Sequence, residues 1–259
     1  MSLQRYFITL SYDGTRYHGW QIQPNGISVE ECLRDALTTL LRKPVETVGA
    51  GRTDAGVHAR KMVVHFDDEL SEENPPAPGL TDGQTIDCQQ LVYRLNRLLP
   101  HDIAVQGVEP VASNMHARFS AVSRTYHYYI HTRKDPFLNR FSCEIHYPLD
   151  FEAMNEAAEW LLTQKDFASF CKAGADVKTT LCTLTHARWT QLSDTSWRFE
   201  ITANRFLRNM VRAVVGTLVE LGRGRLTLGE FQQVVLTRSR SAAGESMPAH
   251  ALFLVDVKY

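Results

Sequence analysis

The 259-residue sequence has few cysteines, and they form no recognisable pattern. The five are odd in number and scattered, and no two are spaced as in a CxxC pair. A disulfide framework and a cysteine-based zinc site are therefore not indicated, and a reducing compartment is expected. The sequence also lacks a basic-plus-apolar leader and any apolar run of membrane-spanning length. We expect a cytoplasmic protein with no membrane partner.

Charge of either sign is not in excess, since the formal net charge is -1. This balance argues against indiscriminate binding of nucleic acids, but it hides a local asymmetry. Residues 201–240 hold seven arginines against Glu220 and Glu230, while residues 67–88 hold seven acids and no base. The arginine-rich stretch is either a phosphate-facing surface or a solvated helix face. The acidic, proline-containing stretch 67–88 is expected to be an exposed excursion from the fold.

Hydrophobic periodicity predicts an α+β protein in which one order of elements occurs twice. In the first half, Ser28 and Glu31 form a capping-box signature ahead of a helical stripe that ends before Pro44. The predicted strands are 6–12, 45–48, 61–66, 103–108, 124–131, 183–190, 197–203 and 252–258, and the predicted helices are 29–41, 91–99, 150–162, 206–218 and 228–235.

Each half therefore reads β-α-β-β-α-β, which is the ferredoxin-like pattern, with one further short helix in the second half. We expect two ferredoxin-like half-domains, 1–109 and 110–259, with a boundary near Pro110. Their sheets are expected to join in a mainly antiparallel central sheet, with an active-site cleft between the halves.

A glycine-rich segment, residues 49–58 with the sequence GAGRTDAGVH, joins two predicted strands. Its glycines permit left-handed backbone and close approach of a ligand. Gly51 and Gly56 have P-loop spacing, but Val57 and His58 stand where Lys and Ser/Thr would be needed. A nucleotide triphosphate site is therefore rejected. Asp54 either caps a turn, which is the commoner role of Asp beside Gly, or takes part in the chemistry of an active site.

Three arginines with the spacing i, i+3 and i+7 lie at the start of the helix predicted over 206–218, and this spacing places them on one helical face. Arg205, Arg208 and Arg212 share this face. Such a face can bind RNA phosphates, pair with a carboxylate, or simply be solvated. Arg212 lies within a mostly apolar helix, where a buried guanidinium would need a partner.

Alternation along the strand 124–131 places Tyr126 and Tyr128 on one face and His127 and Tyr129 on the other. Buried tyrosines most often belong to the core and have a hydrogen-bonded hydroxyl. The functional alternative is that one of them stacks on a base lifted out of an RNA helix.

Taken together, these motifs are similar to those of the tRNA pseudouridine synthase A family along essentially the whole chain. The most specific is the nine-residue segment 51–59, GRTDAGVHA. The other matching segments, in order, are Tyr12-Asp13-Gly14-Thr15 with Tyr17 and Gly19-Trp20-Gln21, then His116 to Ala121, Arg124 with Tyr126 and Tyr128, Asp166-Phe167 with Ser169-Phe170, and Phe206-Leu207 with Met210-Val211-Arg212 and Val215-Gly216. The sequence departs from the family at Arg208-Asn209, where an aromatic or histidine pair is usual, and at Ala251, where a glycine is usual.

The resemblance implies conversion of uridine to pseudouridine at positions 38–40 of the tRNA anticodon stem-loop, without metal, organic or nucleotide cofactor. It also implies a homodimer in which one tRNA contacts both subunits. The family's nucleophile maps onto Asp54, its base-contacting tyrosine onto Tyr126, and the arginine that pairs with the nucleophile onto Arg212. Arg52 is implied in RNA handling, and the arginines Arg205 and Arg208 are candidate substrate-binding residues.

The chemistry of the reaction is consistent with these residue types. A carboxylate can act as a covalent partner, and a paired arginine keeps it ionised and oriented. The detached uracil must be retained, which an aromatic platform can do. The residues leave open whether Asp54 attacks C1′ of the sugar or C6 of uracil, and whether Tyr126 removes the C5 proton.

Two other classes of function remain as alternatives. A non-catalytic RNA-binding or folding module would keep the scaffold and the basic surface. A metal-dependent hydrolase would use Asp54, His58 and His65, although the two histidines have no HxxxH or comparable ligand spacing.

Overall fold

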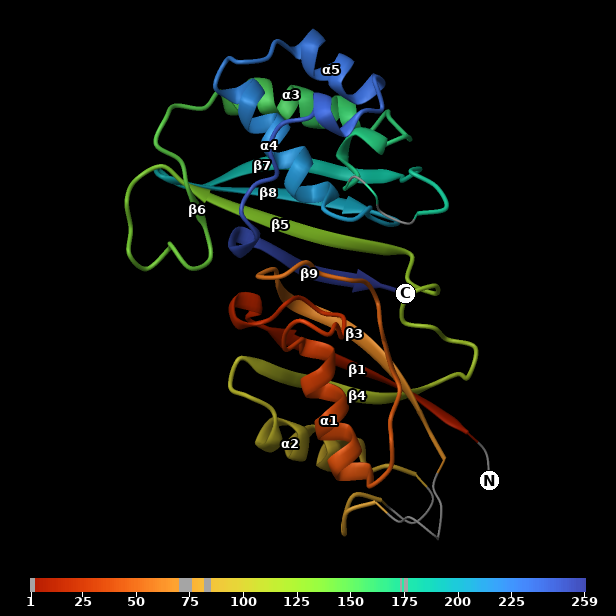
Figure 1. Ribbon diagram of the computed structural model, residues 1–259. Coiled ribbons are helices and arrows are strands. Elements are labelled where there is room, and N and C mark those ends of the chain that lie inside the picture. The colour runs from red at the N-terminus through yellow and green to blue at the C-terminus, as the bar shows by residue number, and fades with distance from the viewer. Residues whose placement is uncertain (1–2, 70–75, 82–84, 173, 175–176) are drawn as a thin grey trace. The chain divides into compact units, whose positions relative to one another are not determined.

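A computed structural model of the protein describes residues 3–69, 76–81, 85–172, 174 and 177–259. The chain divides into two compact units, one formed by Met1–Val122 with Asp256–Tyr259 (unit 1) and the other by Ser123–Val255 (unit 2). Both are mixed α+β structures with mainly antiparallel pairing (Figure 1). No helix in the described part of the chain is long and apolar enough to cross a membrane.

Unit 1 has the predicted order of elements. They are β1 (Gln4–Tyr12), the 3-10 turn η1 (Gly14–Arg16), α1 (Val29–Leu41), β2 (Thr47–Gly49), β3 (His58–Asp68), α2 (Cys88–Leu98) and β4 (Ile103–Val111). Its strands lie in the order β4-β1-β3-β2, and every neighbouring pair is antiparallel. The register places Tyr6 opposite Phe66, and their rings stack with centroids 5.3 Å apart in the core.

Helix α1 begins where the capping-box signature places it. The Ser28 hydroxyl accepts the Glu31 backbone N–H, and the Glu31 carboxylate accepts that of Ser28. These bonds satisfy backbone donors that a helix start leaves without intrahelical partners. The stripe of apolar residues that follows, from Val29 to Leu41, is buried as the periodicity predicts.

Unit 2 has the same order with additional short elements. It contains β5 (Ser123–His131), β6 (Cys143–Glu144), α3 (Phe151–Leu161), the 3-10 turn η2 (Ala168–Phe170), β7 (Leu184–Ser193), β8 (Ser196–Ala203), α4 (Met210–Gly222), α5 (Leu228–Leu236), the 3-10 turns η3 (Arg240–Ala242) and η4 (Ala249–Ala251), and β9 (Leu252–Lys258). Its strands lie in the order β9-β5-β8-β7, with β6 parallel to β5. Strand β9 contributes residues 252–255 to unit 2 and 256–258 to unit 1. Figure 1 shows α3, α4 and α5 on one side of β7 and β8.

The compact units differ from the predicted segments 1–109 and 110–259. Pro110 lies inside β4, where it is paired with Tyr6, and unit 1 continues to Val122. The division of roles between two half-domains stays a prediction.

The acidic stretch 67–88 was expected to be an exposed excursion, and its described part agrees with this only in part, since Pro78 and Gly79 are exposed while other residues are buried. Leu80 and Ile86 are buried, and the Ile86 N–H donates to the Tyr6 hydroxyl at 3.3 Å. The Ala77 N–H donates to the Leu40 carbonyl at 2.9 Å at the end of α1. The buried part departs from the expectation because the few apolar residues among the acids pack against the rest of unit 1. Residues 70–75 and 82–84 lie outside the described part.

Candidate active site

Asp54 lies at the first position of a tight turn in unit 1. The Val57 N–H donates to the Asp54 carbonyl at 3.1 Å, and Gly56 has a φ of 77°. A turn with positive φ at its third residue strongly favours glycine there, so Gly56 is needed for the shape of the loop. The Asp54 side chain is half-buried, and the loop leads into strand β3. A P-loop leads into a helix instead, so this geometry agrees with the exclusion of a triphosphate site.

The loop is supported by the segment that follows β1. The Thr53 carbonyl accepts the Trp20 N–H at 3.2 Å, and the hydroxyls of Thr53 and Tyr12 are 2.8 Å apart. Gly19 has a φ of 90°, and a Cβ there would lie 2.4 Å from the Thr53 carbonyl oxygen. Backbone therefore packs on backbone next to Asp54. The motif residues of segment 12–21 and those of the loop are thus in direct contact in the fold.

Arg52 is exposed at the start of the same loop. Its charge acts on Glu30 of α1, a carboxyl whose pKa is raised chiefly by burial while Arg34 and Arg52 oppose the rise. The side chain of Glu30 accepts the Ile22 N–H at 3.2 Å. Arg52 is thus the solvent-facing cation of the loop, on the side of α1.

His58 and His65 do not form one site. Both lie on β3, seven residues apart, which corresponds to about 23 Å at the ~3.3 Å rise of a strand. Each has its own structural role: His58 Nδ1 accepts the Gly14 N–H at 3.0 Å, and His65 Nδ1 accepts the Ala117 N–H at 3.2 Å. This separation contradicts a metal site built from Asp54 and both histidines.

In unit 2, β5 presents Tyr126 and Tyr128 on its buried face, as the alternation predicts. The Tyr126 side chain is 8% exposed. Its ring packs edge-to-face on the ring of Phe206, with the centroids 5.1 Å apart and the planes at 86°. An edge-to-face pair restrains the orientation of both rings. Tyr126 is therefore an aromatic side chain held in a defined direction near the start of β5.

Arg212 lies in the first turn of α4 and is held by a segment that the sequence analysis did not single out. Its Nε donates to the Met247 carbonyl at 2.6 Å, and the Met247 N–H donates to the Arg212 carbonyl at 3.1 Å. The Asn209 side chain donates to the Ser246 hydroxyl. These reciprocal bonds fix the guanidinium relative to residues 246–247. No periodic pattern marks this segment, and Pro248 directly after it is the single local signal.

The same segment holds Tyr128. Its hydroxyl donates to the Pro248 carbonyl at 3.0 Å. Burial raises the pKa of Tyr128, with a further contribution from Cys143, and the charge of Arg212 opposes the rise. Arg212, Tyr128 and residues 246–248 therefore form one cluster within unit 2.

Arg205 and Arg208 do not lie on the helix, contrary to the prediction. Helix α4 begins at Met210, and Asn209 before it adopts the left-handed conformation with a φ of 65°. This conformation interrupts the helix, so the i, i+3, i+7 spacing does not place the three arginines on one helical face. Arg208 is exposed in the preceding turn, where its carbonyl accepts the Lys172 N–H. Arg205 lies near Cys171 and Cys182. Burial raises the pKa values of these two thiols, and the charge of Arg205 opposes the rise.

Comparison with known proteins relates the whole chain to one family. The model of the tRNA pseudouridine synthase family matches residues 157–259. A tRNA pseudouridine synthase A of Bacteroides fragilis is 54% identical over 259 residues, which is 100% of this chain and 98% of the relative. Proteins of the same name from Porphyromonas gingivalis and Bacillus subtilis are 50% and 38% identical, covering 99% and 97% of this chain and 98% and 97% of the respective relative.

Proposed function

The chain belongs to the tRNA pseudouridine synthase A family, and on this premise we propose that it isomerises uridine to pseudouridine at positions 38–40 of the tRNA anticodon stem-loop. The identity extends over the whole length of the relatives, so the family's reaction applies to the whole chain rather than to a shared module. The observation that carries the assignment of the nucleophile is the rigid, backbone-packed turn that holds the half-buried Asp54.

We propose that each half of the chain is a ferredoxin-like half-domain, the first with Asp54 and the second with Tyr126 and Arg212. The strand orders β4-β1-β3-β2 and β9-β5-β8-β7 support this, because each follows the same path through a β-α-β-β-α-β sequence. In this proposal the two sheets join, and Asp54 works across the cleft from the other two residues.

The chemistry assigns each residue a role. The reaction breaks the bond from C1′ to N1 of uracil and forms the bond from C1′ to C5. The C5 proton goes to solvent, and N1 takes up a proton in exchange. Asp54 is the covalent partner, either at C1′ or at C6, and Arg212 keeps its carboxylate ionised and oriented. Tyr126 stacks on the uracil so that the detached base is retained. Arg52 fills the space left by the unstacked base or holds a phosphate, and Arg205 and Arg208 bind the RNA backbone.

Partner and assembly follow from the same premise. The substrate is tRNA, and we propose a homodimer in which one tRNA contacts both subunits. Light scattering of the purified protein, alone and with tRNA, measures this assembly directly.

The test is release of tritium from tRNA labelled at C5 of a single uridine in the anticodon stem-loop. Wild-type protein is expected to release it with and without a metal chelator, and Asp54→Asn is expected to release none while still binding tRNA. Asp194→Asn, which changes an exposed aspartate in the turn between β7 and β8, is the matched control and should behave as wild type. Wild-type protein that releases no tritium from any such tRNA would contradict the proposal.

The two alternative functions predict different results in this assay. A non-catalytic RNA-binding module would bind tRNA but release no tritium even as wild type, and it would keep its biological effect in the Asp54→Asn variant. A metal-dependent enzyme would lose its activity in the chelator.

A further inference from the structure

An aromatic ring and a guanidinium lie together on the surface of unit 1, in the turn between β4 and β5. The Phe119 side chain is 77% exposed, and the guanidinium carbon of the exposed Arg118 lies 5.6 Å from the centre of the Phe119 ring. Residues 110–124 contain two arginines and no acid. The exposed apolar ring thus lies beside a cation, in a segment of the chain that carries no acid.

Hydrogen bonds to one imidazole hold the turn in shape. His116 Nδ1 accepts the N–H groups of Arg118 and Phe119 at 3.1 and 3.2 Å. The Ser120 hydroxyl accepts the His116 N–H at 2.9 Å, and the Ser120 N–H returns to the His116 carbonyl at 2.9 Å. The His116 ring also lies 4.4 Å from the Phe119 ring, centroid to centroid. The exposed ring is therefore supported from beneath by a second ring.

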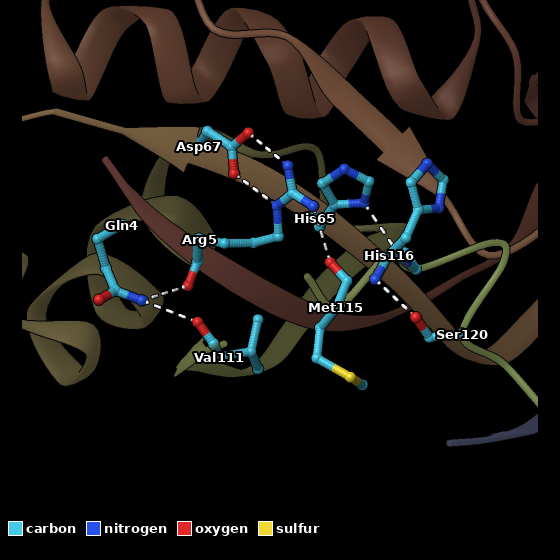
Figure 2. Close-up of polar contacts among 9 residues, drawn as sticks. Gln4, Arg5, His65, Asp67, Val111, Met115, His116 and Ser120 are labelled. Atoms are coloured by element: carbon cyan, nitrogen blue, oxygen red, sulfur yellow. Dashed lines mark hydrogen bonds and ion pairs between the residues drawn. The ribbon is translucent and has the colours of Figure 1, made fainter. Parts of the chain in front are cut away.

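Side chains of the sheet of unit 1 hold the turn of residues 116–120 in place, and Figure 2 shows those around Arg5. Arg5 binds both carboxylate oxygens of Asp67 at 2.6 and 2.7 Å and donates a further bond to the Met115 carbonyl at 2.9 Å. His65 accepts the Ala117 N–H, and the Tyr259 hydroxyl donates to the Ala117 carbonyl at 2.7 Å. Strands β1 and β3 and the end of the chain thus all contribute to one rigid turn.

We propose that Arg118 and Phe119 form a stacking platform for an unpaired base of the RNA substrate. Every base has an aromatic face, so an exposed, pre-ordered ring can stack on it at little entropic cost. The neighbouring guanidinium suits the adjoining phosphate. An apolar protein partner would not require the cation beside the ring. The inference rests on the proposed tRNA substrate.

The platform is separate from the Asp54 loop. His58 follows that loop at one end of β3, and His65 contacts the platform turn at the other, about 23 Å away along the strand. The base at Phe119 is therefore a different nucleotide from the isomerised uridine. The platform contributes to the binding of RNA and not to the chemical step, so its loss should raise KM and leave kcat unchanged.

The experiment compares Phe119→Leu, Phe119→Trp and Tyr93→Leu in the tritium-release assay with full-length tRNA. Leucine keeps the apolar bulk and removes the stacking face, whereas tryptophan keeps the face. Phe119→Leu should raise KM about 10-fold with kcat unchanged, and Phe119→Trp should match wild type or bind more tightly. Tyr93 is a 63% exposed aromatic residue on α2 of the same unit and serves as the control, with no change expected.

Three results would overturn the platform. They are an unchanged KM in Phe119→Leu, equal effects of the Leu and Trp variants, and loss of a dimer in Phe119→Leu by light scattering, which would make Phe119 a contact between subunits. Filter binding of the same tRNA gives the Kd of each variant without turnover. If wild-type protein released no tritium, the proposed function would fail. The Kd values of the variants would still show whether Phe119 contributes to the binding of tRNA.

Discussion

The guanidinium of Arg212 carries a positive charge and is held in a fixed orientation. The Arg212 Nε donates to the Met247 carbonyl at 2.6 Å, and this bond fixes the direction in which the guanidinium points. A lysine would keep the charge and lose this bond, because its ammonium has no fork-shaped donor set. Position, rather than charge alone, is what the residue supplies.

We therefore expect Arg212→Lys to lower kcat by about 100-fold with little change in KM for tRNA, since a small misplacement of a catalytic group has this effect. Arg208→Lys is the control and should leave both constants near wild type, because an exposed phosphate contact depends mainly on charge. Steady-state tritium release measures both. Equal losses in the two variants would contradict a positional role for Arg212.

The buried His65 should make the stability of the fold depend on pH. Burial, with additional repulsion from Arg5 and His116 and a small opposing effect of Asp67, lowers its pKa to about 4. Because the unfolded histidine titrates near ~6.5, the unfolded chain binds more protons between these pH values. The free energy of unfolding should therefore fall as the pH drops from about 6.5 to about 4, by about 3 kcal/mol, and show no contribution from His65 above that range.

Urea unfolding at several pH values checks this expectation against His65→Asn, which keeps an acceptor for the Ala117 N–H but does not titrate. The variant should lose less stability than wild type between pH 6.5 and 4. His101→Asn, at an exposed position, should retain the wild-type slope. Parallel pH profiles for wild type and His65→Asn would show that the buried imidazole does not cause the loss.

Helix α4 shows how a neighbouring segment positions a functional residue. A Cβ on Gly216 would lie 1.9 Å from the Glu245 carbonyl oxygen, and the Gly244 N–H donates to the Thr217 hydroxyl at 3.0 Å. Residues 244–247 thus lie directly on the helix, and this close packing brings the Met247 carbonyl to Arg212.

Gly216→Ala should displace this segment and the guanidinium that depends on it. We expect a loss of stability of about 1–3 kcal/mol from overpacking and a fall in kcat of at least about 10-fold. Gly229→Ala in α5, where a Cβ would meet nothing within 4 Å, is the matched control and should be neutral or slightly stabilising. Thermal unfolding and tritium release separate the two effects. Wild-type stability and activity in Gly216→Ala would contradict the packing argument.

For the whole molecule, a net charge of -1 has to be reconciled with a polyanionic substrate. Local arginines can bind phosphates whatever the net charge, and each neutralised phosphate adds to the salt dependence of binding. The Kd for tRNA should therefore rise steeply with salt. Arg208→Ala should reduce the slope of log Kd against log salt by about 1.

Arg97→Ala is the control for this experiment, since it removes an exposed arginine from the last turn of α2. It should leave the slope unchanged. Filter binding over a range of potassium chloride concentrations measures both variants, and equal slopes for Arg208→Ala and wild type would remove Arg208 from the RNA-binding surface.

Local signals in the sequence were sufficient for much of the secondary structure. Helix α1 begins after Ser28 as its capping box predicts, and β9 spans the predicted residues 252–258. The alternation in β5 correctly placed Tyr126 and Tyr128 on the buried face. In each case, the information lies within a few neighbouring residues, because capping and alternation depend on local backbone geometry.

Contacts between distant residues decided what the sequence did not predict. The start of α4 shifted to Met210 because Asn209 adopts a left-handed conformation and its side chain bonds Ser246. The acidic stretch is partly buried because Ile86 meets Tyr6 across the fold. The sequence alone determined the residue types, the order of elements and the motif around Asp54. Tertiary structure decided how backbone packing holds that loop, how residues 246–248 aim Arg212, and which exposed ring is rigid, since each depends on groups that only folding brings together.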